Sequence, residues 1–189
     1  MPSSRSNAAW RNGNFEIVRL DGDPAPGFDC GRREQNDYLY QLARRDQQLL
    51  LSVTRLCFVE KVLAAYFTTT VDAVELGSRE KDPGVHYRML PALKLAQLGV
   101  DRRFAGTGLG RFLLGYTIEN ARLVRTIVGV RYVTLDAKPD LEAWYGGYGF
   151  VRNKVVQKRR AEARPDDDYL PVSMRFDLLR PSPSREPAR

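Results

Sequence analysis

Three glycines stand at every second position in the stretch VDRRFAGTGLGRFLL, which runs from Val100 to Leu114. They are Gly106, Gly108 and Gly110. Because glycine has no β-carbon, the backbone N–H groups of such a stretch can turn toward a ligand. An apolar helical pattern follows, and the N-terminus of a helix carries about half a positive charge. The stretch is therefore predicted to bind the phosphate groups of a ligand, with Arg103 as a further cation.

Two common phosphate motifs do not fit these glycines. The stretch lacks the G-K-[ST] ending of a nucleoside triphosphate loop, and its G-x-G-x-G spacing differs from the G-x-G-x-x-G of a dinucleotide fold. A tight turn between a strand and a helix, with no ligand, is the alternative. Glycine at every second residue exceeds the needs of one turn, so we favour the anion site.

The elements that must position this stretch follow from apolar periodicity. Strands are expected at residues 15–20, 54–60, 62–71, 92–100, 131–137 and 170–179. Helices are expected at residues 32–46, 109–128 and 140–148, and a long polar loop at 75–91. For residues 154–168 the pattern allows two interpretations, an ordered insertion or a mobile loop. Strands outnumber helices, which predicts an α/β or α+β sheet with helices packed on it.

Length and composition bound the class of protein. The chain has 189 residues, 43% of them hydrophobic, which fits one domain over residues 15–179 with disordered tails at 1–14 and 180–189. Cys30 and Cys57 stand far apart, which argues against a zinc site or a disulfide framework. No apolar run approaches the length of a membrane helix, and a reducing cytoplasm is the expected location.

The excess of basic residues is clustered. The chain has 30 Lys and Arg against 23 Asp and Glu, a net charge of +7. The clusters are Arg32 and Arg33, Arg44 and Arg45, Arg102 and Arg103, and Lys158 to Arg160. Such a surface favours a polyanion such as nucleic acid, and a well-solvated basic surface is the alternative.

Two motifs carry a resemblance to a known family. The run from Arg103 to Gly108, RFAGTG, resembles the R/Q-x-x-G-x-G/A signature of the GNAT superfamily of acetyl-CoA-dependent N-acetyltransferases. The block LEAWYGGYGF is similar to the short helix in which that family carries a tyrosine acid, here Tyr145. The resemblance implies a mixed, largely antiparallel sheet that splays between two strands, with helices on both faces. It also implies acetyl-CoA as co-substrate and no metal.

One branch of the family is more similar still. FDCGRREQNDYLYQLARRDQ, residues 28–47, and AKPD, residues 137–140, resemble the tRNA-acetylating toxins of bacterial toxin–antitoxin pairs. This resemblance implies aminoacyl-tRNA as acceptor, bound by Arg32, Arg33, Arg44 and Arg45. It also implies a ribbon-helix-helix antitoxin and a homodimer as partners. Two segments, residues 152–168 and the loop 75–91, depart from the branch.

The resemblance also implies the residues of the site. In the family the pantetheine arm lies between two splayed strands, here 92–100 and 131–136. The backbone of Leu98 and Val100 then faces the pantetheine amides or the acetyl carbonyl. The implied cofactor-binding residues are Leu98, Val100, Arg103, Ala105, Gly106, Thr107, Gly108, Leu109 and Gly110.

Tyr145 is the implied general acid. A phenol with a pKa of about 10 stays protonated at neutral pH and can donate a proton to a departing thiolate. The alternative for Tyr145 is ordinary packing beside Trp144 and Tyr148.

No general base is evident in the sequence. His86 is the single histidine, and Asp72 and Glu75 are carboxylates near the end of the second hairpin strand. An α-amine with a pKa of about 8 is already partly neutral, whereas a lysine amine near 10.4 must lose a proton first. A site without a strong base therefore suits an α-amine acceptor.

Three functions remain open at this point. The first is a toxin that acetylates aminoacyl-tRNA, and the second is an acetyltransferase for a small amine or a protein N-terminus. The third is an acetyl-CoA-binding regulatory module without turnover. Salt-sensitive binding of tRNA distinguishes the first from the second, and loss of rate in Tyr145→Phe distinguishes both from the third.

Overall fold

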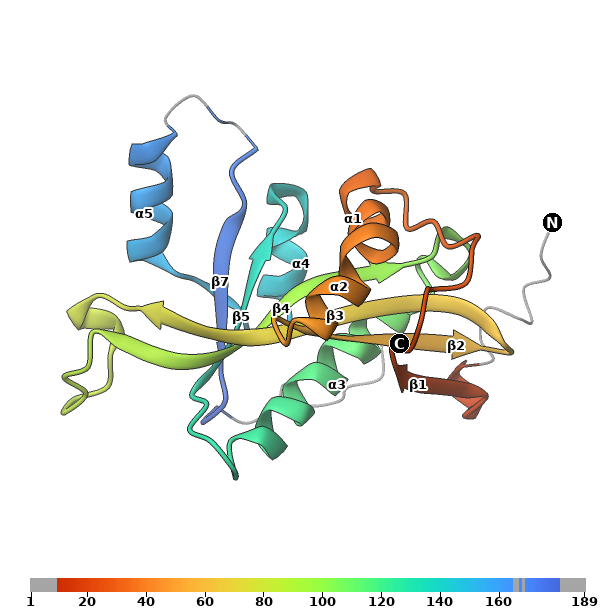
Figure 1. Ribbon diagram of the computed structural model, residues 1–189. Coiled ribbons are helices and arrows are strands. Elements are labelled where there is room, and N and C mark those ends of the chain that lie inside the picture. The colour runs from red at the N-terminus through yellow and green to blue at the C-terminus, as the bar shows by residue number, and fades with distance from the viewer. Residues whose placement is uncertain (1–9, 165–166, 168, 181–189) are drawn as a thin grey trace. The chain divides into compact units, whose positions relative to one another are not determined.

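The computed structural model (Figure 1) describes residues 10–164, 167 and 169–180. Its residues form two compact units, the first made of residues up to 70 with 95–117, and the second of 71–94 with residues from 118 onward. Three elements contribute residues to both units: β3 (Val62–Glu75), β4 (Met89–Val100) and α3 (Leu109–Val124). The prediction of one domain over residues 15–179 stays a prediction.

The strands of the described residues form one sheet in the order β1-β2-β3-β4-β5-β7-β6. The remaining strands are β1 (Phe15–Arg19), β2 (Val53–Val59), β5 (Tyr132–Ala137), β6 (Val151–Arg152) and β7 (Val172–Asp177). The pairs β1–β2, β2–β3, β5–β7 and β6–β7 are antiparallel. The predicted fold class, with a largely antiparallel sheet, is confirmed.

The predicted hairpin of β2 and β3 is present in the first unit. Its turn is formed by Glu60 and Lys61, with φ angles of +49° and +66°. Two successive residues with positive φ match the backbone twist of antiparallel strands. The register shifts once, between Cys57 and Phe58, and β1 pairs with the outer side of β2.

The basic helix predicted at residues 32–46 is built from three segments. They are α1 (Arg33–Asp37), the π-helical turn η2 (Tyr38–Leu42) and α2 (Ala43–Gln48). Leu39 and Ala43 are fully buried and belong to a core cluster with Leu20, Phe28 and Tyr66. Of the apolar face expected from the periodicity, Tyr38, Leu39, Leu42 and Ala43, the residues Leu39 and Ala43 are buried, whereas Leu42 is 42% exposed. The π turn has no signal in the periodicity.

Gly99 of β4 lies against the ring of Tyr66. A β-carbon on Gly99 would be 2.7 Å from Tyr66 Cε1 and 3.2 Å from Phe28 Cζ. Tyr66 is itself buried, and its hydroxyl donates to Gln35 O at 2.6 Å. The absence of a side chain at Gly99 therefore lets the ring of Tyr66 reach α1.

An aromatic cluster covers the start of α3. The ring of Phe112 lies 5.0 Å from that of Phe15 and 5.4 Å from that of Trp10, between ring centroids. The predicted tail of residues 1–14 is described only from Trp10 onward, where residues 10–12 form a 3-10 turn, and the C-terminal tail beyond residue 180 lies outside the described residues. The helix predicted to end at residue 128 ends at Val124, and the chain continues in turns over residues 125–127.

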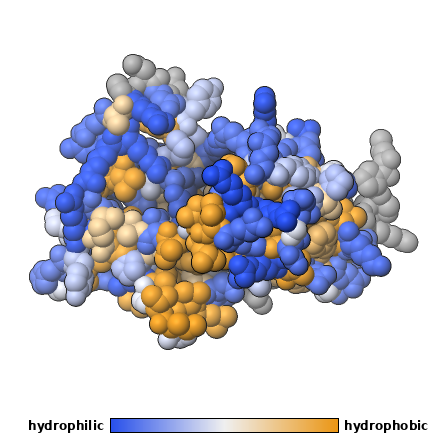
Figure 2. All heavy atoms as spheres, in the orientation of Figure 1, coloured by the Kyte–Doolittle hydropathy of each residue, from blue (hydrophilic) through white to orange (hydrophobic). Residues whose placement is uncertain are grey.

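The second unit contains the short helix α4 (Glu142–Gly146) and the helix α5 (Lys154–Ala163). Its core includes Val74, Leu76, Leu90, Ala92 and Tyr132. Helix α5 occupies the segment that the sequence left open, and hydrophilic atoms cover most of it in Figure 2. Across the described residues, no helix combines the length and apolar character needed to cross a membrane.

Gly99→Ala is expected to destabilise the protein. The added methyl group must displace the Tyr66 ring, which costs about 1–3 kcal/mol in a packed core. Urea unfolding measures the free energy of unfolding. The matched control is Gly115→Ala in α3, where a β-carbon meets nothing within 4 Å, and helix propensity predicts a gain of up to about 1 kcal/mol. Equal stability of the Gly99 variant and wild type would contradict the close packing.

Candidate functional site

The glycine loop joins the end of β4 to the start of α3. Gly106 and Gly108 have φ angles of +73° and +88°, in the left-handed region that side chains disfavour. Gly110 lies inside α3 with ordinary helical backbone. Two of the three glycines are therefore required by the conformation of the loop.

The backbone of this loop presents N–H groups at a helix N-terminus. Within it, Thr107 N–H donates to Phe104 O at 3.4 Å and the Thr107 hydroxyl donates to the same oxygen at 2.7 Å. Among the described residues, neither the N–H of Gly106 nor that of Gly108 donates to a backbone carbonyl. The first-turn N–H groups of α3 add to these, since a helix leaves them unbonded internally. The arrangement is chemically suited to an anion.

The side chain of Arg103 is bound by Asp101. Its Nε lies 2.7 Å from Asp101 Oδ1 and its Nη2 lies 2.9 Å from Oδ2, and Nη2 also donates to Gly27 O at 3.3 Å. These hydrogen bonds, led by those from the guanidinium to Asp101, raise the pKa of Arg103. The charge of the expected loop cation is thus balanced by a carboxylate within the protein.

Asp101 accepts four hydrogen bonds at the end of β4. Besides the two from the Arg103 side chain, it accepts from Arg103 N–H at 2.9 Å and from Asp29 N–H at 3.0 Å. Burial alone would raise the pKa of Asp101, but the bonds from Arg103 and Asp29 outweigh it and the pKa lies below its ordinary value. A carboxylate in this network is ionised at neutral pH.

The backbone around Leu98 is held by α1. Leu98 O accepts from Gln35 Nε2 at 3.4 Å, and Gln35 O accepts from the Tyr66 hydroxyl. Burial raises the pKa of Tyr66, so its hydroxyl keeps its proton. The sequence motifs did not point to Gln35, Tyr66 or Asp101, because their bonds to Leu98, Gln35 and Asp29 join positions far apart in the sequence.

Tyr145 lies in α4, in the second unit, and is buried. Its ring is edge-on to Trp144 at 4.8 Å and to Phe150 at 5.8 Å between centroids. Trp144 in turn contacts Tyr148 at 4.8 Å. Packing beside aromatic neighbours is therefore present, and the role of the phenol as acid stays a prediction.

The three candidate bases differ in their surroundings. Glu75 accepts from Arg159 Nη1 at 2.6 Å and from Arg88 Nε at 3.2 Å, and these bonds, the one from Arg159 first, lower its pKa. Asp72 accepts from the Thr134 hydroxyl at 2.5 Å and from Ala73 N–H. His86 is exposed in the loop before β4. Glu75 is thus poorly suited to accept a proton.

The four arginines expected to bind tRNA lie at the start of α1 and in α2. Arg33 and Arg44 are exposed and form ion pairs with Asp37 at 3.4 Å and Asp23 at 2.9 Å. Arg32 is the N-cap residue of α1, and Arg45 is exposed on α2. Because exposed ion pairs are weak, Arg33 and Arg44 can exchange them for phosphates.

The basic run of α5 is held within the second unit. Arg159 pairs with Glu75 at 2.6 Å, and Arg160 pairs with Asp136 at 2.7 Å and donates to Pro171 O. Asp136 also binds Lys94 Nζ at 2.7 Å. These two arginines, which the charge clusters had placed among the candidate phosphate ligands, attach α5 to β3 and β5.

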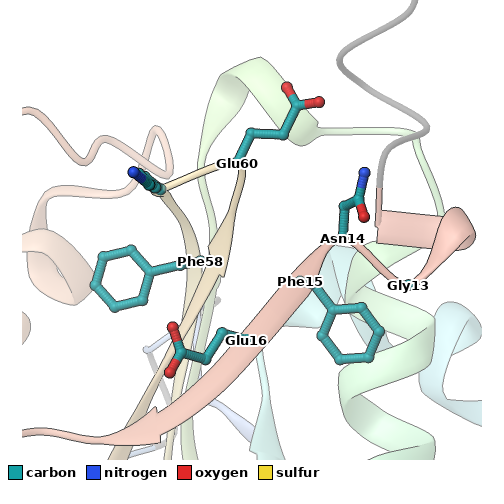
Figure 3. A pocket seen from close by; sticks show the side chains of 7 residues that line it. Gly13, Asn14, Phe15, Glu16, Phe58 and Glu60 are labelled. Carbon is teal, nitrogen blue, oxygen red and sulfur yellow. The ribbon is translucent and has the colours of Figure 1, made fainter.

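A hollow lies near the start of β1 (Figure 3). It is lined by Gly13, Asn14, Phe15, Glu16, Phe58, Glu60 and Lys61. None of these belongs to the predicted site, and the carboxylates of Glu16 and Glu60 oppose an anion. Among the described residues, no three His, Cys, Asp or Glu side chains gather as a possible metal site.

The strand order, the glycine loop before α3 and the short helix α4 correspond to a GNAT-like fold. The sequence matches no family model and no curated protein. Among solved structures, AtaT complexed with acetyl-methionyl-tRNAfMet is 19% identical, with a TM-score of 0.72 over 87% of this chain and 95% of that chain. A Tyr-to-Phe mutant of KacT is 17% identical, with a TM-score of 0.71 over 88% of this chain and 96% of that chain. AtaTR bound with acetyl-CoA is 19% identical, with a TM-score of 0.68 over 88% and 95%. The chain shares the fold of these toxin structures.

Asp101→Asn is expected to lower the free energy of unfolding by about 2 kcal/mol at pH 7, because a buried acceptor of charged hydrogen bonds is lost. A depressed pKa stabilises the fold above the unfolded-state value near 3.8 and stops doing so as pH falls through the folded value. The difference between variant and wild type must therefore shrink below about pH 4.

Urea unfolding at several pH values measures this difference. Asp23→Asn, in the exposed pair with Arg44, is the control and is expected to change stability by less than about 1 kcal/mol. A pH-independent difference for the Asp101 variant would contradict the network.

Proposed function

We propose that this chain is an acetyl-CoA-dependent N-acetyltransferase that transfers an acetyl group to a primary amine. The observation that carries the proposal is the glycine loop, where Gly106 and Gly108 adopt left-handed backbone at the N-terminus of α3. A ligand with a pyrophosphate fits such N–H groups. One solved structure of the same fold, that of AtaTR, is bound with acetyl-CoA.

In this proposal the loop and β4 bind the cofactor, and Tyr145 transfers the proton. The N–H groups of Gly106, Gly108, Leu109 and Gly110 bind the pyrophosphate, and the backbone around Leu98 and Val100 binds the pantetheine arm. The thioester supplies the acetyl group. The acceptor nitrogen forms a bond to the acetyl carbon, and the bond from carbon to sulfur breaks. Tyr145 gives its phenolic proton to the departing thiolate and regains one from the acceptor nitrogen.

We further propose the α-amine of aminoacyl-tRNA as the acceptor. Glu75 is engaged by two arginines, and Asp72 accepts from the Thr134 hydroxyl and Ala73 N–H, so both candidate carboxylates of β3 are hydrogen-bonded within the protein and neither is a strong base. An α-amine with a pKa of about 8 reacts without one. Arg32, Arg33, Arg44 and Arg45 then bind tRNA phosphates, and one structure of the same fold holds acetyl-methionyl-tRNAfMet.

The partners proposed from this function are an antitoxin and a second copy of the chain. AtaT has been solved bound to the C-terminus of the antitoxin AtaR, and KacTA in complex with DNA. An antitoxin of the ribbon-helix-helix class, a homodimer and a cytoplasmic location accompany the toxin proposal.

The first experiment mixes labelled acetyl-CoA and the protein with charged tRNA, uncharged tRNA, free amines and peptides. Label that enters charged tRNA alone, and leaves on deacylation, supports the toxin. Label on amines or peptides supports the second acetyltransferase function, in which the basic helix is a solvated surface. Binding of acetyl-CoA without transfer supports the regulatory module.

Tyr145→Phe is expected to lower kcat about a hundredfold, because the departing thiolate loses its proton donor. The phenyl ring keeps the contacts with Trp144 and Phe150, so the Kd for CoA should not change. Steady-state rates and calorimetry measure the two quantities. Tyr148→Phe, whose ring also contacts Trp144, is the control. An unchanged rate would remove the phenol from the mechanism.

The proposal that no strong base is needed has its own test. Loss of turnover in Asp72→Ala or Glu75→Ala, with intact CoA binding, would contradict it.

Removing both Arg44 and Arg45 is expected to weaken tRNA binding and flatten its salt dependence. Each lost phosphate contact reduces the slope of log K against log salt by about 0.7–0.9. Filter binding at several salt concentrations measures the slope. The control removes Arg159 and Arg160, which pair with Glu75 and Asp136. Equal slopes for wild type and the α2 variant would favour a smaller acceptor.

A further inference from the structure

The segment before β1 contacts the glycine loop. Arg11 Nη2 donates to Thr107 O at 2.8 Å. A β-carbon on Gly108 would lie 3.4 Å from Arg11 Nη2 and 3.5 Å from Trp10 Cζ2. A residue that the sequence placed in a tail is therefore adjacent to the residues expected to bind phosphate.

Trp10 anchors this segment to α3. Its ring is half-buried and lies 5.4 Å from the ring of Phe112. The guanidinium carbon of Arg11 lies 5.5 Å from the centroid of the Trp10 ring, within the range of a cation–π contact. The position of Arg11 at the loop is thus fixed by packing against the helix that follows the loop.

The bond to Thr107 O determines where the next N–H points. The peptide between Thr107 and Gly108 is trans, and the C=O and N–H of a trans peptide point in opposite directions. Arg11 occupies the carbonyl side, so the N–H of Gly108 faces the other way. A cationic donor on the carbonyl also polarises the peptide and strengthens that N–H as a donor.

The charge balance of the two arginines also favours Arg11 as the cation at the glycine loop. The charge of Arg103 is balanced by Asp101, whereas Arg11 is exposed and contacts a neutral carbonyl. Within the described residues, no carboxylate pairs with Arg11. Its charge therefore adds to the positive potential of the α3 N-terminus.

We infer that Arg11 is a positioning residue for the pyrophosphate of the cofactor, which orients the N–H of Gly108 and supplies the cation that Arg103 does not. This inference rests on the proposed function, because it presumes that the loop binds CoA. Trp10 serves as the anchor that holds Arg11 in place.

Calorimetric titration of the full chain with CoA and with dephospho-CoA tests the inference. Arg11→Ala should weaken binding of both ligands about threefold to tenfold, because the N–H of Gly108 becomes a weaker and less well oriented donor to the pyrophosphate. The factor should be the same for both, because both contain the pyrophosphate and only CoA has the 3′-phosphate. Arg11→Lys should restore most of the affinity, and Arg11→Gln, which keeps a donor without the charge, should fall between them.

Arg19→Ala is the matched control, since Arg19 is an exposed arginine of β1 outside the loop contacts, and it should leave the affinity unchanged. Wild-type affinity in Arg11→Ala would overturn the inference, as would a loss seen with CoA but not with dephospho-CoA, which would place Arg11 at the 3′-phosphate. A loss that Arg11→Lys does not restore would assign a structural role and also overturn it. If wild type itself binds no CoA, the proposed function fails as well, so the two failures are distinguishable.

Discussion

One buried carboxylate, that of Asp101, fixes the backbone of the first unit between the end of β4 and the glycine loop. Asp101 follows the last residue of β4, and its own N–H donates to Ala64 O of β3 at 2.9 Å. Its side chain accepts bonds from Arg103 and from Asp29 N–H, which joins β4 to the segment that leads into α1. An ionised group with 2% exposure is tolerated only when donors surround it. The 3-10 turn at Arg102–Phe104, and with it the direction of the glycine loop, depends on this carboxylate.

This constraint changes how the loop can recognise a ligand. Because Arg103 is bound by Asp101, the proposed recognition of phosphate falls to backbone N–H groups, whose direction the chain conformation fixes. Backbone groups are preorganised and lose no side-chain entropy when a ligand binds. The loop is then sensitive to whatever fixes its peptide planes, including groups that touch only its carbonyls.

Local patterns predicted much of the fold. The hairpin, the start of α3 at Leu109 and the last strand follow from periodicity that residues within one element share. The pairing of Glu75 with Arg159 joins residues 84 positions apart, and no local pattern contains it. Charge clustering therefore counted Arg159 as a candidate phosphate ligand, although the fold uses it to attach α5. Likewise, Asp101 appeared as one acidic residue before two arginines, and its burial depends on the distant loop at Asp29.

The π turn at Tyr38–Leu42 marks a place where the basic helix holds one residue more than regular geometry needs. A π turn holds one residue more than an α-helix accommodates in the same rise. Deleting one residue there would restore regular geometry and leave the following residues close to their present directions. Ala43 would keep its buried place in the core, and the neighbouring Arg44 would keep its direction. A deletion within α2 would instead rotate the residues after it by about 100° around the axis. The helix can therefore lose one residue at the π turn without disturbing the core or the basic surface.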